Sequence, residues 1–218
     1  MRSRVGGVAS ALQTRPMNLT ALATEAPTLA LRGAMVLVRR FNAADIPMVV
    51  NQENDRAIMR WIRDPQPAAE VQARAEAMAA PWRGADGEWL ACTVVPHATG
   101  IPAGIVVCRV TVAAHATMEF GYRLSQDVHR RGFGFEACML LCDHLFTQVG
   151  VRKLVALCVA DNEPSWRLMA KLGMQREARL REYTHLDGAW RDEFVYGLLA
   201  REWRRPAATG VLANPQSH

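Results

Sequence analysis

The residues best suited to chemistry lie in one run, "DVHRRGFGFEACMLLCDHLF", residues 127–146. Its centre, "GFGFEA", fits the pattern G-x-G-x-x-G/A, which holds a pyrophosphate at the start of a helix in dinucleotide-binding folds. Glycines allow a ligand to approach the backbone closely, and the free N–H groups of a helix start bind anions. Arg130 and Arg131 add positive charge just before Gly132. The run therefore predicts a site for an anion.

The spacing around these glycines argues against NAD as that anion. A dinucleotide site needs a strand that runs directly into the first glycine. Here the strand-like "TMEFGYRL" ends near Leu124, and the polar "SQDVHRR" separates it from Gly132. Asp161 stands where a ribose-binding acid would sit, but Asp161 or Asn162 serves equally well as the N-cap of a helix that begins in "DNEPSW".

Periodicity and turn signals predict the elements that position this run. We expect strands over 34–41, 88–96, 103–111, 117–124 and 152–159, and a hairpin over 177–199 that turns at Asp187-Gly188. Helices are expected over 67–82, 133–150 and 162–173, and over 42–62 as one capped helix or a broken pair with Asp45 as a candidate N-cap. This order predicts an α/β (α+β) fold with a mixed, mostly antiparallel sheet.

Length and composition are those of one domain with two tails. The chain has 218 residues, 50% of them hydrophobic, which suffices for one core. We assign residues 34–203 to the domain, residues 1–33 to a flexible extension and residues 204–218 to a flexible tail. No apolar run approaches the roughly 18 residues of a membrane span, so we expect no membrane association.

Net charge and cysteine content limit which partners, compartment and metal sites we expect. A net charge of +5 favours an anionic partner, but the arginines are not gathered into one run with aromatic residues, which argues against nucleic acid. Five cysteines lie inside apolar segments without paired spacing, which favours a reducing cytoplasm. Cys138 and Cys142 share an apolar helical face that His144 does not, so we expect core residues and no metal site.

Several motifs in fixed order resemble the GCN5-related N-acetyltransferases, and within them the RimJ/RimL-type ribosomal-protein N-terminal acetyltransferases. "HRRGFG", from His129 to Gly134, is similar to the family signature Arg/Gln-x-x-Gly-x-Gly/Ala, with His129 at the position of Arg or Gln. Asp161, Asn162 and Ser165 match "DN-x-x-S". "MAKLGM" follows, with Met174 in place of Phe, and "REYTHLDGAWRDEFVYGLL" resembles the closing hairpin of the branch. The resemblance covers about residues 35–203.

The resemblance implies helices on both faces of the sheet and direct transfer of an acetyl group from acetyl-CoA to a primary amine, without a metal. The amides of the glycine loop would hold the coenzyme A pyrophosphate, and a backbone N–H near Leu124 to Val128 would meet the oxyanion. The cofactor-binding residues implied are Leu124, Val128, His129, Arg130, Arg131, Gly132, Phe133, Gly134, Asn162 and Ser165.

Two side chains are candidates for catalysis. Glu119 in "MEFGY" matches an acidic position of the family and could take the proton of the amine; alternatively, it is a solvent-facing strand residue. Ser165 matches the residue near the coenzyme A sulfur and could protonate the leaving thiolate, or it only satisfies backbone donors in the first turn of a helix. Asn162 either binds the pantetheine arm or caps the helix.

The acceptor is less defined by sequence. By resemblance, the helices between Asp45 and Trp82 wall its site, and Tyr183 and His185 could face it. Tryptophans 61, 82, 89 and 166 either line the pocket or belong to the core. We expect a protein N-terminal amine of the ribosomal-protein type; the alternatives are a small-molecule amine (amino acid, aminoglycoside or polyamine) and an inactive coenzyme A-binding module. A homodimer is compatible with the sequence.

Overall fold

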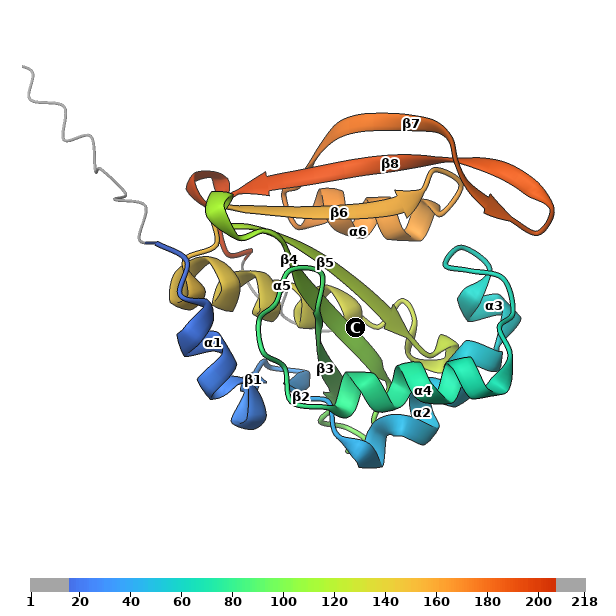
Figure 1. The fold of residues 1–218 in the computed structure, drawn as a ribbon, viewed down its shortest axis with the longest axis horizontal. Coiled ribbons are helices and arrows are strands. Elements are labelled where there is room, and N and C mark those ends of the chain that lie inside the picture. The colour runs from blue at the N-terminus through green and yellow to red at the C-terminus, as the bar shows by residue number, and fades with distance from the viewer. Residues whose placement is uncertain (1–15, 207–218) are drawn as a thin grey trace, which may run out of the picture.

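A computed structural model describes residues 16–206, which form one mixed sheet with helices on both faces (Figure 1). The eight strands are β1 (Ala30–Arg32), β2 (Val36–Arg40), β3 (Trp89–Pro96), β4 (Gly104–Val112), β5 (Thr117–Leu124), β6 (Lys153–Val159), β7 (Gln175–Leu186) and β8 (Ala189–Leu199). Their order is β1-β2-β3-β4-β5-β6-β8-β7. Neighbours are antiparallel except β5 and β6, which are parallel, so the predicted mixed, mostly antiparallel sheet is confirmed.

The helices after residue 33 follow the expected order, and α1 was not expected. They are α1 (Leu19–Glu25), α2 (Ile46–Asn54), α3 (Arg56–Met59), α4 (Ala68–Ala79), α5 (Phe133–His144) and α6 (Glu163–Lys171), with a π-helical turn over Leu145–Val149. Short 3₁₀ turns cover Ala26–Thr28, Ala43–Asp45, Ala113–His115, Gln126–Val128 and Ala200–Glu202. The expected segment over 42–62 is a broken pair, because Asp55 ends α2 and caps α3 by accepting from the Ala57 and Ile58 amides. Within residues 16–206, no helix has the length and apolarity that a bilayer crossing requires.

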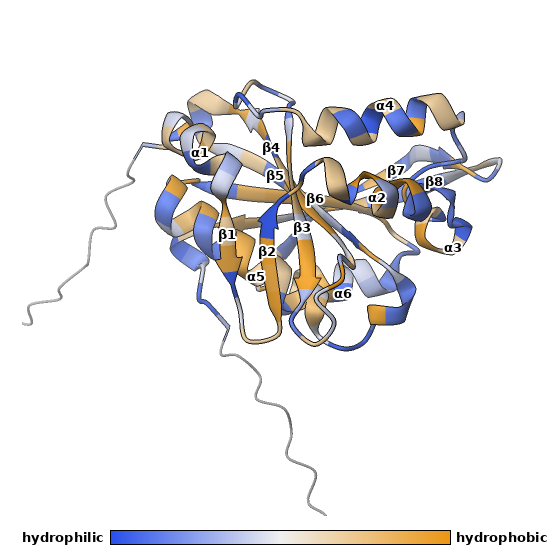
Figure 2. Ribbon diagram, turned by 90° about the horizontal axis from the view of Figure 1, so that it is seen from below, coloured by the Kyte–Doolittle hydropathy of each residue, from blue (hydrophilic) through white to orange (hydrophobic). Residues whose placement is uncertain are grey.

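Two hydrophobic clusters lie on opposite faces of the sheet. On the face that we call the α5 face, α1, α5 and α6 pack over strand residues such as Phe120 and Cys158. On the other, the α2 face, α2 and α4 pack over Ala91 and Ile105. Figure 2 shows hydrophobic colour along β2 and β3, whereas α4 carries both colours, as expected for a helix with one covered side.

Residues 16–33 correct the expected extension. Leu22, Ala26 and Leu29 are buried against the main cluster, and β1 pairs with β2 from Ala30 to Arg32. Burial of three apolar side chains spaced three or four residues apart explains why this segment is structured, although its Ala- and Thr-rich composition hid this periodicity. Residues 1–15 of the expected extension, and residues 207–218 of the expected tail, lie outside the described residues.

The closing hairpin turns at Asp187-Gly188 as predicted. It forms the edge of the sheet, with β7 outermost and β8 paired to β6 from Lys153 to Val159. Figure 1 shows this three-strand group standing apart from the far end of β5.

The separation begins at a defined residue. β5 and β6 pair only from Thr117 to Glu119 on one strand and from Lys153 to Val155 on the other, yet β5 continues to Leu124 and β6 to Val159. Beyond Glu119 the two strands have no register with each other, and Figure 1 shows them running apart. Backbone groups that face this gap are therefore free to bind another extended chain.

Asp45 is buried, and its side chain does not cap α2 as expected. Its carboxylate instead accepts two bonds from Arg39, at 2.7 and 2.8 Å, one from Thr93 Oγ1 at 2.8 Å and one from the Asn42 amide at 3.0 Å. Burial raises the pKa of Asp45, but the bonds from Arg39, Asn42 and Thr93 outweigh it and leave the pKa lowered. The group ties β2 and β3 to the entry of α2.

Replacement of Asp45 by Asn should lower the free energy of unfolding at pH 7 by about 2 kcal/mol, because Arg39 loses its charged partner. A lowered native pKa stabilises the fold fully above the unfolded value of about 3.9 and less as pH falls through the native value. The difference in free energy of unfolding between wild type and variant should therefore persist at pH 5 and decrease below about pH 4. Urea unfolding across this range tests this, with exposed Asp86→Asn as a control; a difference that is constant down to pH 3 contradicts it.

Candidate active site

The glycine loop lies at the N-terminus of α5, on the α5 face, as predicted. Arg130 has φ 58° and Gly132, at the N-cap position, has φ 84°. No side chain of the described residues caps α5, so its first N–H groups remain available to an anion. A left-handed arginine is strained, which is typical of loops shaped for a ligand.

His129, which departs from the family signature, has a defined role in this loop. One of its ring nitrogens lies 3.0 Å from the carbonyl oxygen of Leu124, the last residue of β5. With the proton on Nε2, His129 donates to that carbonyl and fixes the loop to the strand end. His129, Arg130 and Arg131 are all exposed, but His129 contacts the strand end.

The remaining loop residues are divided between core and site. Leu124, Val128 and Phe133 have buried side chains. Gly134 lies against β5 and α6, since a Cβ there would meet Leu124 at 3.2 Å and Leu168 at 3.6 Å. The glycine loop, the end of β5 and helix α6 therefore meet at one place.

Two amides of the segment from Leu124 to Val128 are used within the protein, and an oxyanion donor elsewhere in this segment stays a prediction. The Ser125 N–H donates to Ala103 O at 2.8 Å, and the Val128 N–H donates to Ser125 O at 3.3 Å. Both donors are consumed within the protein. Pairing between β5 and β6 ends at Glu119, so later β5 amides that face β6 are not used by that strand.

Glu119 is the last residue of β5 that pairs with β6, and it projects on the α2 face. Its Oε2 accepts from Arg109 Nε at 2.9 Å and from Nη2 at 2.6 Å, and Arg109 also lies 4.6 Å from the ring centre of Trp89. Within the described residues, no hydrogen bond occupies Oε1. Glu119 is thus not a free solvent-facing residue: it is oriented by a cation and keeps one oxygen available.

Ser165 lies on the opposite face, in contact with a residue that sequence reasoning missed. The Tyr122 hydroxyl donates to Ser165 O at 2.9 Å and lies 3.0 Å from Ser165 Oγ. Burial raises the pKa of Tyr122, so its hydroxyl stays protonated. The signal was present in the sequence, because strand alternation puts Tyr122 on the face opposite Glu119, but its partner on α6 is 43 residues away.

Asn162 occupies the N-cap position of α6 but makes no capping bond with its side chain. Its carbonyl accepts from the Ser165 and Trp166 amides. The interpretation of the Asn162 side chain as a helix cap is therefore not supported. Among the described residues, no hydrogen bond occupies this side-chain amide. Asp161 pairs with Arg191 at 3.3 Å.

The α2 face beside Glu119 is walled by two further contacts. Glu53 of α2 is buried and accepts from Arg123 of β5 at 2.7 Å, which locks α2 to the strand. Across the opening, Asp187 at the tip of the hairpin pairs with Arg56 of α3, and its N–H donates to Asp64 at 2.9 Å. Helices α2 and α3 and the tip of the hairpin therefore lie beside this face, and their role as walls of the acceptor site stays a prediction.

The tryptophans divide between the two expected roles. Trp82 is buried and donates to Glu88 O, so it belongs to the core. Trp166 packs partly buried on the α5 face. Trp61 lies between Arg60 and Arg191, and Trp89 contacts Arg109, the partner of Glu119; a place of either ring in an acceptor pocket stays a prediction. Tyr183 is exposed, and His185 meets Trp190 edge-on at the hairpin.

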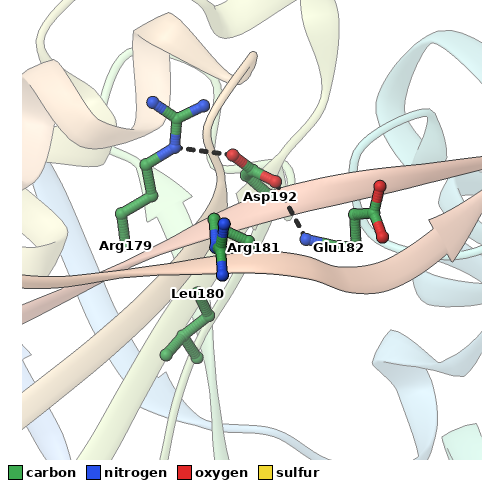
Figure 3. A pocket seen from close by; sticks show the side chains of 5 residues that line it. All are labelled: Arg179, Leu180, Arg181, Glu182 and Asp192. Carbon is green, nitrogen blue, oxygen red and sulfur yellow. Dashed lines mark hydrogen bonds and ion pairs between the residues drawn. The ribbon is translucent and has the colours of Figure 1, made fainter.

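A surface hollow of about 640 Å³ opens on the hairpin, away from these residues (Figure 3). Asp192 there accepts from Arg179 Nε at 2.6 Å and from the Glu182 amide at 2.9 Å. These bonds hold Glu182 in a left-handed conformation, φ 50°, where β7 carries extra residues between Leu180 and Thr184. The hollow is thus a by-product of a β-bulge, and no predicted catalytic or cofactor residue lines it.

Comparison with known proteins decides the family. The family described as "Acetyltransferase (GNAT) domain" matches residues 36–175, which are 140 of the 218 residues. The chain belongs to this acetyltransferase family. It is an N-acetyltransferase built on the fold that the sequence motifs implied.

Relatives and solved structures agree with this assignment. The uncharacterized N-acetyltransferase YnaD of Bacillus subtilis (strain 168) is 25% identical over 77% of this chain and 95% of its own length. The [ribosomal protein uS5]-alanine N-acetyltransferase of Escherichia coli (strain K12) is 28% identical over 38% of this chain and 43% of that enzyme. The GNAT-family acetyltransferase of Bacillus anthracis shares the fold, with a TM-score of 0.70 and 23% identity over 80% of this chain and all of the other.

The cysteines of this acetyltransferase are placed as core residues. All five are buried, and burial raises the pKa of Cys92 to about 12 and that of Cys158 to about 11, although Cys158 lies beside Ser165. Within the described residues, no group of three His, Cys, Asp or Glu side chains could hold a metal. His144 pairs with Glu25 of α1 at 2.8 Å.

We expect none of the five thiols to react rapidly with a disulfide reagent at pH 7.5, because a raised pKa keeps them protonated and burial excludes the reagent. All five should react once guanidinium unfolds the chain. Labelling counted by mass spectrometry, against glutathione as a free thiol, tests this. Rapid labelling of Cys158 in the folded protein would contradict it.

Proposed function

We propose that this acetyltransferase moves the acetyl group of acetyl-CoA directly to a primary amine, and that its acceptor is a protein N-terminus in the cytoplasm. The proposal rests on the separation of β5 and β6 after Glu119. Strand alternation gives this gap a carboxylate on one face and the Tyr122–Ser165 pair on the other. The thioester thus lies in the gap between a base and a proton donor.

Acetyl-CoA would lie on the α5 face and enter the gap between the strands. Its pyrophosphate meets the free amides of the loop from Arg130 to Gly134, with the two exposed arginines nearby. The pantetheine arm then follows β5, whose unpaired backbone groups can bind its amides, and the free Asn162 side chain is a further partner. The pantetheine arm thus pairs with the part of β5 that β6 does not pair with.

The amine would approach from the α2 face. An α-amino group, with a pKa of about 7.7–8.0, loses its proton far more readily than lysine at about 10.4, so a modest base suffices. The free Oε1 of Glu119 accepts that proton directly or through water while Arg109 holds Oε2. The nitrogen then attacks the acetyl carbon.

Collapse of the tetrahedral intermediate breaks the bond between carbon and sulfur and leaves a thiolate. A thiol of pKa about 8.5 leaves more readily when it is protonated at the same time. Ser165 Oγ supplies that proton in the proposal and takes a proton back from solvent, while the contact with Tyr122 orients the hydroxyl. No acetyl-cysteine forms, which accords with the burial of every thiol.

Two observations favour a protein acceptor over a small amine: the activity of one relative and the charges on the acceptor side. The matched enzyme that acts on ribosomal protein uS5 supports a protein N-terminus. The walls of the acceptor side carry Arg60, Arg191 and Trp61, and their acids Glu53 and Asp187 are paired with arginines. A polyamine would instead require clustered acids that are free to bind its cations.

The test is a panel of acceptors with acetyl-CoA and purified full-length protein, read as acetylated product by mass spectrometry. Peptides with free N-termini should be acetylated, and the same peptides with blocked N-termini should not. Spermidine and free amino acids should turn over at least tenfold more slowly. Faster turnover of any small amine would overturn the acceptor assignment, and failure to bind acetyl-CoA would overturn the whole proposal.

Glu119→Gln should reduce kcat/KM about 10²-fold, because the amine must then lose its proton to solvent, and the pH profile should move upward. Stability should change by less than about 1 kcal/mol, since a cross-strand ion pair contributes little. Arg109→Gln is the matched control: it removes the same ion pair but keeps the carboxylate. Equal losses of activity in both variants, or an unchanged pH profile in Glu119→Gln, would refute the role of Glu119 as the base.

A further inference from the structure

Glu136 is a buried carboxylate that the proposed reaction does not use. It lies in the first turn of α5, directly after the glycine loop, and is only 4% exposed. Its Oε1 accepts from the Ala34 amide at 2.7 Å, and its Oε2 accepts from the Met35 and Val36 amides at 2.8 and 2.9 Å. Three backbone donors from a turn about one hundred residues away thus converge on one side chain.

The same turn contacts the glycine loop at a second point. The methyl carbon of Met35 lies beneath Gly132, where a Cβ would come within 3.2 Å of it. Gly33, at the start of the turn, leaves just enough room for the carboxylate, because a Cβ there would lie 2.5 Å from Glu136 Cδ. The turn over 33–36 and the glycine loop are therefore packed as one unit, joined by Glu136.

This contact has a consequence for the charge at the start of α5. A carboxylate in the first turn of a helix stabilises the helix but repels a bound phosphate. In this protein the three amides from the turn over 33–36 compensate that charge. The N–H groups of the loop stay free for the ligand, and the loop itself is held in its strained conformation.

We propose that Glu136 is a positioning residue for the cofactor: by binding the turn over 33–36, it fixes the glycine loop in the shape that holds the coenzyme A pyrophosphate. This inference rests on the proposed use of acetyl-CoA. It makes a prediction opposite in sign to simple electrostatics. Loss of a negative charge near a phosphate should tighten binding, whereas loss of the contact that shapes the loop should weaken it.

The test compares Glu136→Gln with wild type, using acetyl-CoA and S-acetyl-pantetheine, which lacks the pyrophosphate, as alternative donors. The KM for acetyl-CoA should rise about tenfold, while kcat/KM with S-acetyl-pantetheine should change less than about twofold. Glu70→Gln is the matched control, since Glu70 occupies the first turn of α4 but is exposed. It should leave both donors unaffected.

A second variant separates the loop from the charge. Gly33→Ala keeps every donor and the carboxylate but displaces the Glu136 side chain, so it should raise the KM for acetyl-CoA selectively as well. If circular dichroism shows that Glu136→Gln does not fold, Gly33→Ala tests the positioning role in its place. An unchanged or lower KM for acetyl-CoA, or an equal loss with both donors, overturns the inference. A wild-type protein that neither binds nor uses acetyl-CoA overturns the proposed function itself, which separates the two failures.

Discussion

The point at which β5 and β6 stop pairing is the constraint on which the rest of the site depends. Parallel strands normally satisfy each other along their length, but these two share register only from Thr117 to Glu119. Every group assigned to the reaction lies at this division: Glu119 at its apex, Tyr122 on one strand and Ser165 on the helix that follows the other. The gap gives an extended ligand a backbone to pair with and a route from one face of the sheet to the other.

Such a gap is costly unless the separated strands are held from outside. The described residues supply that support on both sides. β6 is anchored by seven residues of pairing with β8, from Lys153 to Val159. The end of β5 is held on the α2 face by the buried pair of Arg123 and Glu53 and on the α5 face by the bond from Tyr122 to α6. Because a buried ion pair is expensive to break, the open part of β5 keeps its course without a partner strand.

The glycine loop follows the same principle on a smaller scale. Arg130 and Gly132 are held in left-handed conformations by contacts at either end of the loop. His129 binds the end of β5, and Glu136 binds the turn over 33–36. A loop that is held in one conformation before binding would lose less freedom on binding an anion, which favours affinity. His129, at the position where the family signature has Arg or Gln, makes its contact with the carbonyl of Leu124.

The sequence by itself determined the order of elements from residue 34 onward, the mixed sheet, the hairpin turn at Asp187-Gly188 and the family, because periodicity, turn residues and ordered motifs are local signals. It also indicated Glu119, Ser165 and the glycine loop as candidates, and their roles remain predictions. Only the tertiary structure decided what those residues touch. The partners Arg109, Tyr122 and the amides of 34–36 lie 10, 43 and about 100 residues from Glu119, Ser165 and Glu136, and no local pattern specifies such pairings. The same reason explains why the sequence did not predict helix α1 and strand β1. These elements are structured because α1 is buried in the core cluster and β1 pairs with β2, and their own composition does not indicate either contact.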